Sequence, residues 1–105
     1  MLELNEKNFQ AEVLEEQKQA VLVDFWAPWC GPCRMQTPVL ESFAARYGDR
    51  VKVAKFNTDE GADVPARYGV MSIPTLIVFK NGETVKTAVG VQNIEALKRL
   101  TGISE

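Results

Sequence analysis

Cys30 and Cys33 are the residues of this chain whose types and spacing are best suited to covalent chemistry. They are the only cysteines among 105 residues, and they lie in the segment WCGPC at positions 29–33. The apolar run from Val21 to Trp26 predicts a buried strand before them, and the apolar spacing over 35–47 predicts a helix after them. We therefore expect the pair at a strand-to-helix junction, with Cys30 at the start of the helix and Cys33 one turn inside.

This placement predicts different properties for the two thiols. Residues three apart on a helix have Cβ atoms about 5 to 6 Å apart, so a small adjustment brings two cysteines into disulfide geometry. Because the free N–H groups and dipole of a helix N-terminus favour an anion, the pKa of the Cys30 thiol is expected to lie below that of a free cysteine. Cys33 is expected to be less exposed. A nucleophilic thiol and a resolving thiol are what a catalyst of thiol–disulfide exchange requires.

Two other uses of the cysteine pair are a structural disulfide and half of a zinc site shared between two chains. A closed zinc site needs four ligands, and the sequence has no histidine, so a single chain would have to add carboxylates or dimerise. The pattern therefore favours redox catalysis without a metal. The absence of histidine also removes any imidazole base, which leaves carboxylate, lysine, thiol or water for proton transfer.

Composition narrows the class of protein. The 12 basic and 14 acidic residues are scattered, with a net charge of −2, and form no basic block for nucleic acid or an anionic membrane. No apolar run approaches the roughly 20 residues that span a bilayer, and residues 1–19 lack the apolar core of a signal peptide. We expect a monomeric cytoplasmic protein with one domain, 1–105. In the reducing cytoplasm, a lone Cys-X-X-Cys is more often catalytic or metal-binding than structural.

Asp24 and Lys55 are charges at positions that the strand pattern makes apolar. Period-two counting puts Asp24 on the same face as Leu22 and Trp26, opposite the face of Val21. A buried carboxyl group has its pKa raised toward neutrality and can exchange protons there; a solvated or salt-bridged carboxylate is the alternative. Lys55, on the next strand, is expected to partner Asp24 directly or through water. Its alternative is a side chain that extends its ammonium into solvent.

The remaining pattern predicts an α/β domain whose central mixed sheet has a parallel core, an antiparallel hairpin edge and flanking helices. Asn5 is expected to cap a first helix that fades by 17–19, and Pro38 is expected to kink the helix over 35–47. Further strands are predicted over 51–57, 75–80 and 83–89, with a short helix within 59–68 and a last helix over 93–100. Asn81 and Gly82 form a hairpin turn signal between the last two strands.

On these residues the chain resembles the thioredoxin family. The WCGPC segment follows a strand that ends in Asp24-Phe25-Trp26, and the match continues through Ile73-Pro74-Thr75 and Gly90 to the end of the chain. The resemblance implies the thioredoxin fold, with an additional short strand near the N-terminus. It also implies that Cys30 attacks protein disulfides, Cys33 resolves the mixed disulfide, and Asp24 takes the proton of Cys33. A thioredoxin reductase would then restore the dithiol, with no cofactor beyond the redox-active disulfide.

The resemblance further implies a docking surface. General frequencies favour a trans bond before Pro74, whereas in this family the matching proline is cis and faces the disulfide, and the Ile73 backbone pairs with substrate backbone. The expected flat apolar docking patch consists of Trp29, Gly31, Pro32, Ile73, Pro74, Val89, Gly90 and Val91. Phe25 and Trp26 are expected in the core.

Some positions depart from the family pattern. Thioredoxins usually carry an aliphatic residue at the position of Thr58 and apolar or small residues at those of Gln36 and Thr37, so partner preference is affected. Val64-Pro65-Ala66 is expected to affect only the short helix. A disulfide oxidant or isomerase is the nearest alternative, and Pro32 argues against it. A histidine at this position would stabilise the reduced form and so make the protein an oxidant. A non-catalytic binding module that uses only the patch is the alternative from another class.

Overall fold

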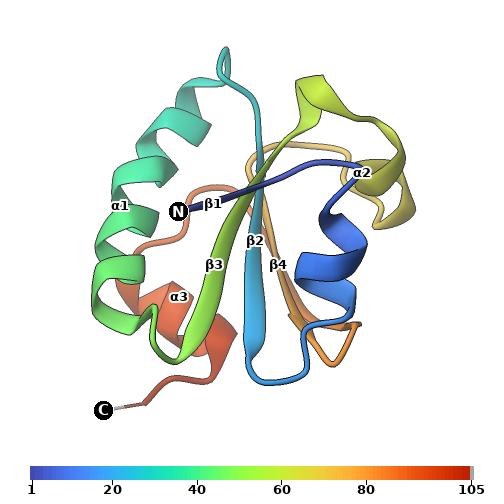
Figure 1. Ribbon diagram of the computed structural model, residues 1–105. Coiled ribbons are helices and arrows are strands. Elements are labelled where there is room, and N and C mark those ends of the chain that lie inside the picture. Colours follow the sequence, from blue (N-terminus) through green and yellow to red (C-terminus); the bar gives the residue numbers. More distant parts are fainter. Residues whose placement is uncertain (105) are drawn as a thin grey trace.

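The computed structural model describes residues 1–104, in which helices and strands alternate along the chain (Figure 1). The elements in chain order are β1 (Leu2–Leu4), η1 (Gln10–Leu14), β2 (Ala20–Trp26), α1 (Gly31–Tyr47), β3 (Val51–Asn57), η2 (Thr58–Glu60), α2 (Asp63–Arg67), β4 (Thr75–Lys80), β5 (Glu83–Val89) and α3 (Ile94–Thr101). The strands and helices expected from the sequence are therefore present.

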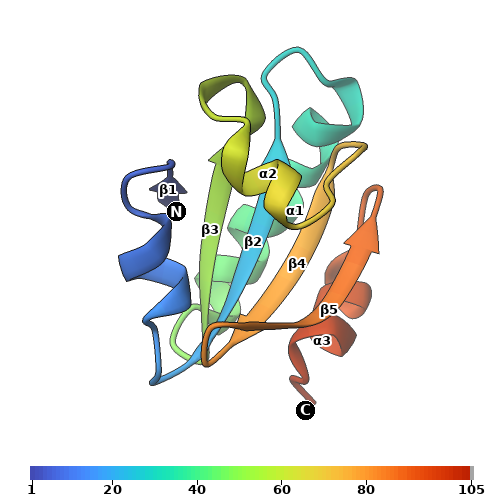
Figure 2. The same ribbon diagram turned by 90° about the vertical axis from the view of Figure 1, so that its right-hand side faces the viewer.

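The five strands form one mixed sheet in the order β1-β3-β2-β4-β5, seen edge to edge in Figure 2. β1, β3 and β2 are parallel, whereas β4 runs antiparallel to β2 and β5 antiparallel to β4. This confirms the parallel core with an antiparallel hairpin edge. β1 is the additional N-terminal strand that the family resemblance implied.

Helices cover both faces of the sheet, with α1 and α3 on one side and η1 and α2 on the other (Figures 1 and 2). The alternation along β2 explains this arrangement, because Val21, Val23 and Phe25 join the core under η1 and α2, whereas Leu22 joins the core under α1 and α3. As the central strand, β2 is thus held from both sides, and its carboxyl end is a fixed platform for the residues that follow.

The hydrogen bonds of the Asn5 side chain form in the turn before the first helix, whereas η1 itself begins at Gln10 with no side-chain cap. The side-chain oxygen of Asn5 accepts hydrogen bonds from the backbone N–H groups of Lys7 (2.8 Å) and Asn8 (3.0 Å). The helix that follows is shorter and wider than expected: η1 is π-helical, and the N–H of Glu15 donates to the carbonyl of Gln10 at 2.9 Å. At the other end of the chain, Asn93 caps α3.

α1 carries the active segment on its first turn and core residues on its later turns. Leu40, Phe43 and Tyr47 are buried against the sheet, and the helix ends before Gly48, as predicted. It continues through Pro38 without ending. Only four residues separate the end of β2 from the start of α1, so the two cysteines lie at the carboxyl end of the central parallel strand.

The hairpin between β4 and β5 turns at the predicted residues. Asn81 and Gly82 both have positive φ, 52° and 80°, which is the conformation of a two-residue type I′ turn. A Cβ atom on Gly82 would lie 2.7 Å from the backbone oxygen of Leu14 at the end of η1. Glycine is therefore required there both by the turn and by the approach of η1.

Gly82→Ala is expected to destabilise the protein more than Gly102→Ala. Gly102 has a similar φ of 75°, but a Cβ atom on it would meet no neighbouring group within 4 Å, so that variant carries only the left-handed backbone cost, about 1 to 2 kcal/mol. The Gly82 variant adds a clash with backbone, of roughly 1 to 3 kcal/mol. Urea unfolding of both variants measures the difference. Equal losses would show that η1 moves aside freely.

Candidate functional site

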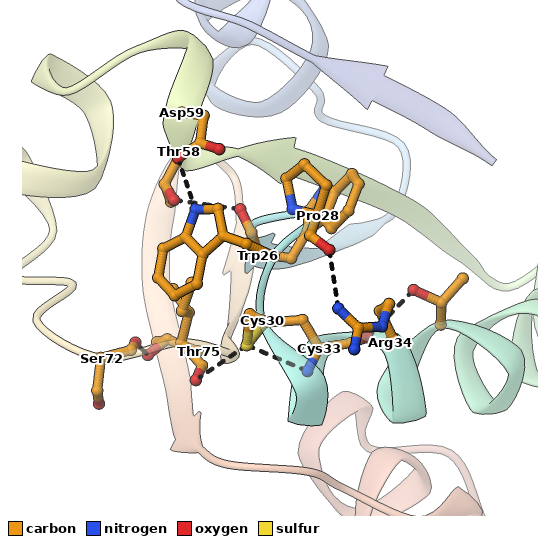
Figure 3. Close-up of a disulfide and its surroundings, with 12 residues drawn as sticks. Trp26, Pro28, Cys30, Cys33, Arg34, Thr58, Asp59, Ser72 and Thr75 are labelled. Carbon is orange, nitrogen blue, oxygen red and sulfur yellow. Dashed lines mark hydrogen bonds between the residues drawn. A yellow bond between two sulfur atoms is a disulfide. The ribbon is translucent and has the colours of Figure 1, made fainter.

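Cys30 and Cys33 form a disulfide at the N-terminus of α1 (Figure 3), with Cα atoms 5.2 Å apart. Cys30 is the N-cap residue, and the backbone N–H of Cys33 donates to its sulfur at 3.2 Å. Cys33 is fully buried, whereas Cys30 keeps 5% of its surface exposed. The expected placement of the pair and the expected order of exposure are thus confirmed. Of the two cysteines, only Cys30 contacts solvent.

The segment before β4 lies beside the disulfide. The Ile73–Pro74 bond is cis, as the family resemblance implied. The backbone oxygen of Ile73 is 3.7 Å from the Cys30 sulfur, and the Ile73 side chain packs against the cysteine pair. Within residues 1–104 the backbone N–H of Ile73 makes no hydrogen bond. This segment therefore presents a free backbone donor next to the reactive sulfur.

The other residues of the docking patch come from two further segments. The N–H of Gly90 donates to the carbonyl of Pro74 at 2.8 Å, which holds the chain after β5 against the cis proline. Trp29 is 68% exposed, Val89 63% and Val91 42%. Pro74 itself is buried and supports the patch from beneath instead of contributing surface. The expected patch is thus assembled beside the disulfide, and its most exposed side chains, Trp29, Val89 and Val91, are apolar.

The indole of Trp29 is fixed by a hydrogen bond from Nε1 to Asp59 at 3.1 Å. Thr58 and Asp59, both labelled in Figure 3, come from the start of η2. A hollow of about 220 Å³ lies between this indole and Ile73. Its other lining residues are Thr58, Pro65, Val70, Met71 and Ser72.

Two residues of this hollow were missed or misjudged from the sequence. Met71 is 96% exposed, and no local pattern distinguishes it from an ordinary loop residue. Pro65 was expected to affect only the short helix α2, but it also lines the hollow beside Trp29. Both reach the site through the packing of α2 and the loop after it, which local sequence does not reveal.

Gln36 lies beneath the docking patch, whereas Thr37 lies on the side of α1 that faces Lys55. The Gln36 side chain is fully buried and makes two hydrogen bonds with the backbone of Gln92: its Nε2 donates to the carbonyl at 2.9 Å, and its Oε1 accepts from the N–H at 2.6 Å. Thr37 donates from Oγ1 to the carbonyl of Cys33 at 3.2 Å and accepts from the ammonium of Lys55 at 3.2 Å.

Asp24 is a fully buried carboxyl group, and within residues 1–104 neither of its oxygens has a hydrogen-bond partner. Burial raises its pKa from the ordinary 3.8 to about 7, and the charge of Lys55, its neighbour on β3, opposes part of the rise. Asp24 is thus buried with a raised pKa and is not a solvated surface carboxylate.

Lys55 does not bond Asp24 directly. Its ammonium lies 3.9 Å from the centroid of the Trp26 ring and donates to Thr37. Trp26 was expected in the core, but it is only half-buried, because with Thr37 and Lys55 it lines a hollow of about 300 Å³ on the α1 side of the sheet. Lys55 therefore acts on Asp24 only through space, while its ammonium contacts Trp26 and, on the helix that carries Cys33, Thr37.

Neither a metal cluster nor a membrane-spanning helix is found in residues 1–104. They contain no group of three or more cysteine, histidine, aspartate or glutamate residues placed to hold a metal ion. In the same part of the chain, no helix has the length and apolar character needed to cross a membrane.

A sequence model of the family described as Thioredoxin matches residues 1–101. The chain belongs to the thioredoxin family. The protein named Thioredoxin 1 of Synechococcus elongatus is 55% identical over 87 residues, which are 83% of this chain and 80% of that protein. Thioredoxin of Bacillus subtilis is 48% identical over 100 residues, 95% of this chain and 93% of the relative. Thioredoxin of Alicyclobacillus acidocaldarius is 52% identical over 95 residues, 90% of this chain and 89% of the relative.

Membership of the thioredoxin family establishes the fold and the chemistry. The chain is a thiol–disulfide oxidoreductase that acts through its Cys-X-X-Cys site, and it is a redox carrier and disulfide reductase. Such a thioredoxin acts between a reductase and substrate proteins.

Asp24→Asn is expected to stabilise the oxidised protein above neutral pH. Because folding raises the pKa of Asp24, the native state binds the proton more tightly than the unfolded state, so stability falls as pH rises from about 3.8 to about 7. The full difference between the two pKa values of Asp24 corresponds to roughly 4 kcal/mol of stability. Removing the carboxyl should therefore raise the free energy of unfolding by a few kcal/mol at pH 8 and by much less at pH 4.

Denaturant unfolding of the oxidised protein at a series of pH values measures this difference. Asp49→Asn, at an exposed aspartate, is the matched control and should change stability little at any pH. An Asp24→Asn variant that is less stable than the parent at pH 8 would contradict the assignment of a buried carboxylate that is unfavourable when ionised.

Proposed function

We propose that this thioredoxin is a general reductant of protein disulfides that works as a cytoplasmic monomer and is re-reduced by a thioredoxin reductase. The observation that carries the proposal is the Cys30–Cys33 disulfide at the start of α1, with Cys30 alone reaching the surface inside an apolar docking patch. The patch offers no cluster of basic side chains, so we expect neither nucleic acid nor a membrane surface among its partners.

Cys30 is the attacking thiolate in this proposal. When the pair is reduced, the N–H of Cys33 and the other free amides of the first turn of α1 can stabilise its negative charge. The thiolate attacks one sulfur of a substrate disulfide, a sulfur–sulfur bond forms between Cys30 and the substrate, and the second substrate sulfur leaves as a thiolate.

Cys33 resolves the mixed disulfide, and Asp24 takes its proton. The buried thiol of Cys33 gives up its proton as its sulfur attacks that of Cys30; the Cys30–Cys33 disulfide forms, the bond from Cys30 to the substrate breaks, and the substrate sulfur of that bond leaves as a thiolate that takes its proton from solvent. A carboxyl group with a pKa of about 7 is matched to accept that proton near neutrality. The place of Asp24 on β2, the strand that leads directly into the helix carrying Cys33, supports this role.

Substrate orientation is assigned to the Ile73 backbone. Its N–H is free within the described chain, and its carbonyl lies against the Cys30 sulfur, so an extended peptide can pair here as a short added strand. Trp29, Val89 and Val91 then give apolar contact with little preference for sequence, which suits a reductant of many proteins.

Reduction of insulin by dithiothreitol, with and without the protein, tests the function. The parent should accelerate the reaction, and Cys30→Ser should abolish the acceleration because it removes the nucleophile. Cys33→Ser should instead form lasting mixed disulfides with substrate proteins, which dithiothreitol releases. An unchanged insulin rate with the parent would indicate a binding module, and equal trapping by Cys30→Ser would reverse the assigned roles.

Asp24→Asn is expected to lower turnover although it raises stability. The loss should be largest at pH 6 to 7, because hydroxide and buffer then replace the carboxylate poorly as proton acceptors, and it should shrink as pH rises. Single-turnover reduction of insulin by the reduced protein across pH measures it. Parental activity at pH 6 to 7 would remove Asp24 from the mechanism.

A further inference from the structure

The amide of Gln36 is an unusual component of the region beneath the disulfide. Gln36 lies on α1 one turn after Cys33, and it is fully buried, like Asp24. Burying an amide is unfavourable unless its donor and acceptor are both bonded. Here both are used, and both bonds go to one residue 56 positions away, Gln92.

Gln92 belongs to the docking loop, residues 89–92, which carries Val89, Gly90 and Val91 of the docking patch. Inside the loop, the side-chain Nε2 of Gln92 donates to the carbonyl of Gly90 at 3.0 Å, and the N–H of Gly90 donates to Pro74 at 2.8 Å. The loop is therefore held at one end by the cis-proline segment and at the other by Gln36. Without the Gln36 amide, the N–H and the carbonyl of Gln92 would lose these two partners.

We propose that Gln36 is a positioning residue that holds the docking loop in its binding conformation before a partner arrives, and so favours protein disulfides over small disulfides. The inference rests on the proposed function, since it needs the docking patch to bind substrate proteins. Its physical basis is preorganisation: a loop that is already ordered has less conformational entropy to lose on docking. An apolar side chain at position 36 could fill the same space, but it could not bond the loop.

Gln36→Met tests this because methionine has a similar length and no hydrogen-bonding amide. We expect the KM for insulin to rise several-fold with kcat unchanged, because part of the binding free energy is then used to order the loop. Reduction of 5,5′-dithiobis(2-nitrobenzoic acid), which is too small to span the loop and the disulfide together, should keep its parental rate. Gln10→Met, at an exposed glutamine on η1, is the matched control and should leave both substrates unaffected.

Amide hydrogen exchange gives an independent readout. In Gln36→Met the N–H of Gln92 should exchange at least several-fold faster, whereas amides of β4 such as that of Ile77 should keep their protection, which shows that the fold is intact. Gln36→Leu is also apolar and cannot bond the loop, so it should show the same faster exchange at Gln92 and the same rise in KM as Gln36→Met. This second variant also keeps the test open if the methionine variant folds poorly.

The outcomes separate this inference from the proposed function. The inference is supported if the KM rises for insulin alone and the N–H of Gln92 exchanges faster in the same variants. Equal losses with insulin and the small disulfide would overturn it, because Gln36 would then act on the cysteine chemistry one turn away. Faster exchange at Gln92 with unchanged insulin kinetics would also overturn it while leaving the reductant function intact. If the parent itself fails to accelerate insulin reduction, the proposed function fails and the inference fails with it.

Discussion

The structure depends on where α1 begins. Because Cys30 caps the helix, its sulfur accepts the N–H of Cys33, and the second cysteine falls one turn inside, fully buried and within disulfide reach. The same start places both sulfurs at the carboxyl end of β2, beside the segment that enters β4. A helix that began elsewhere would separate the thiolate-stabilising amides from the sulfur. The core on both faces of the sheet serves to keep this one junction in place.

Asp24 shows that the protein gives up stability at the site. A fully buried carboxyl group without a hydrogen-bond partner in the described chain is unfavourable when ionised, and the neighbouring ammonium offsets only part of that cost because it contacts Trp26 and Thr37 instead. A direct ion pair with Lys55 would lower the pKa of Asp24 and stabilise the fold, but it would also weaken the carboxylate as a base near neutrality. The observed arrangement fits proton exchange better than it fits stability.

Most of the fold could be predicted because its signals are local. Alternation along β2 correctly placed Val21 and Leu22 on opposite faces and Asp24 in the interior, and Asn81-Gly82 specified the hairpin turn. The direction of the Lys55 ammonium and the partner of Gln36 could not be predicted. Both contacts depend on which backbone group or ring from a distant segment approaches the side chain, and the periodicity of a sequence does not predict that. The π-helical form of η1 was likewise not predicted from its residue types.

The docking patch consists of three separate segments, and hydrogen bonds fix two of them, the segment at Trp29 and the docking loop. Trp29 is held by Asp59, the chain at Gly90 by the Pro74 carbonyl, and the end of the docking loop by Gln36. Apolar contacts have no direction, so by themselves they would allow a partner to dock in many orientations. These hydrogen bonds fix the shape of the apolar surface, and the free Ile73 N–H lies beside the disulfide, where it could give a docked peptide its direction. Under the proposed function, a broad choice of partner and a defined angle of attack on Cys30 are therefore compatible in one small surface.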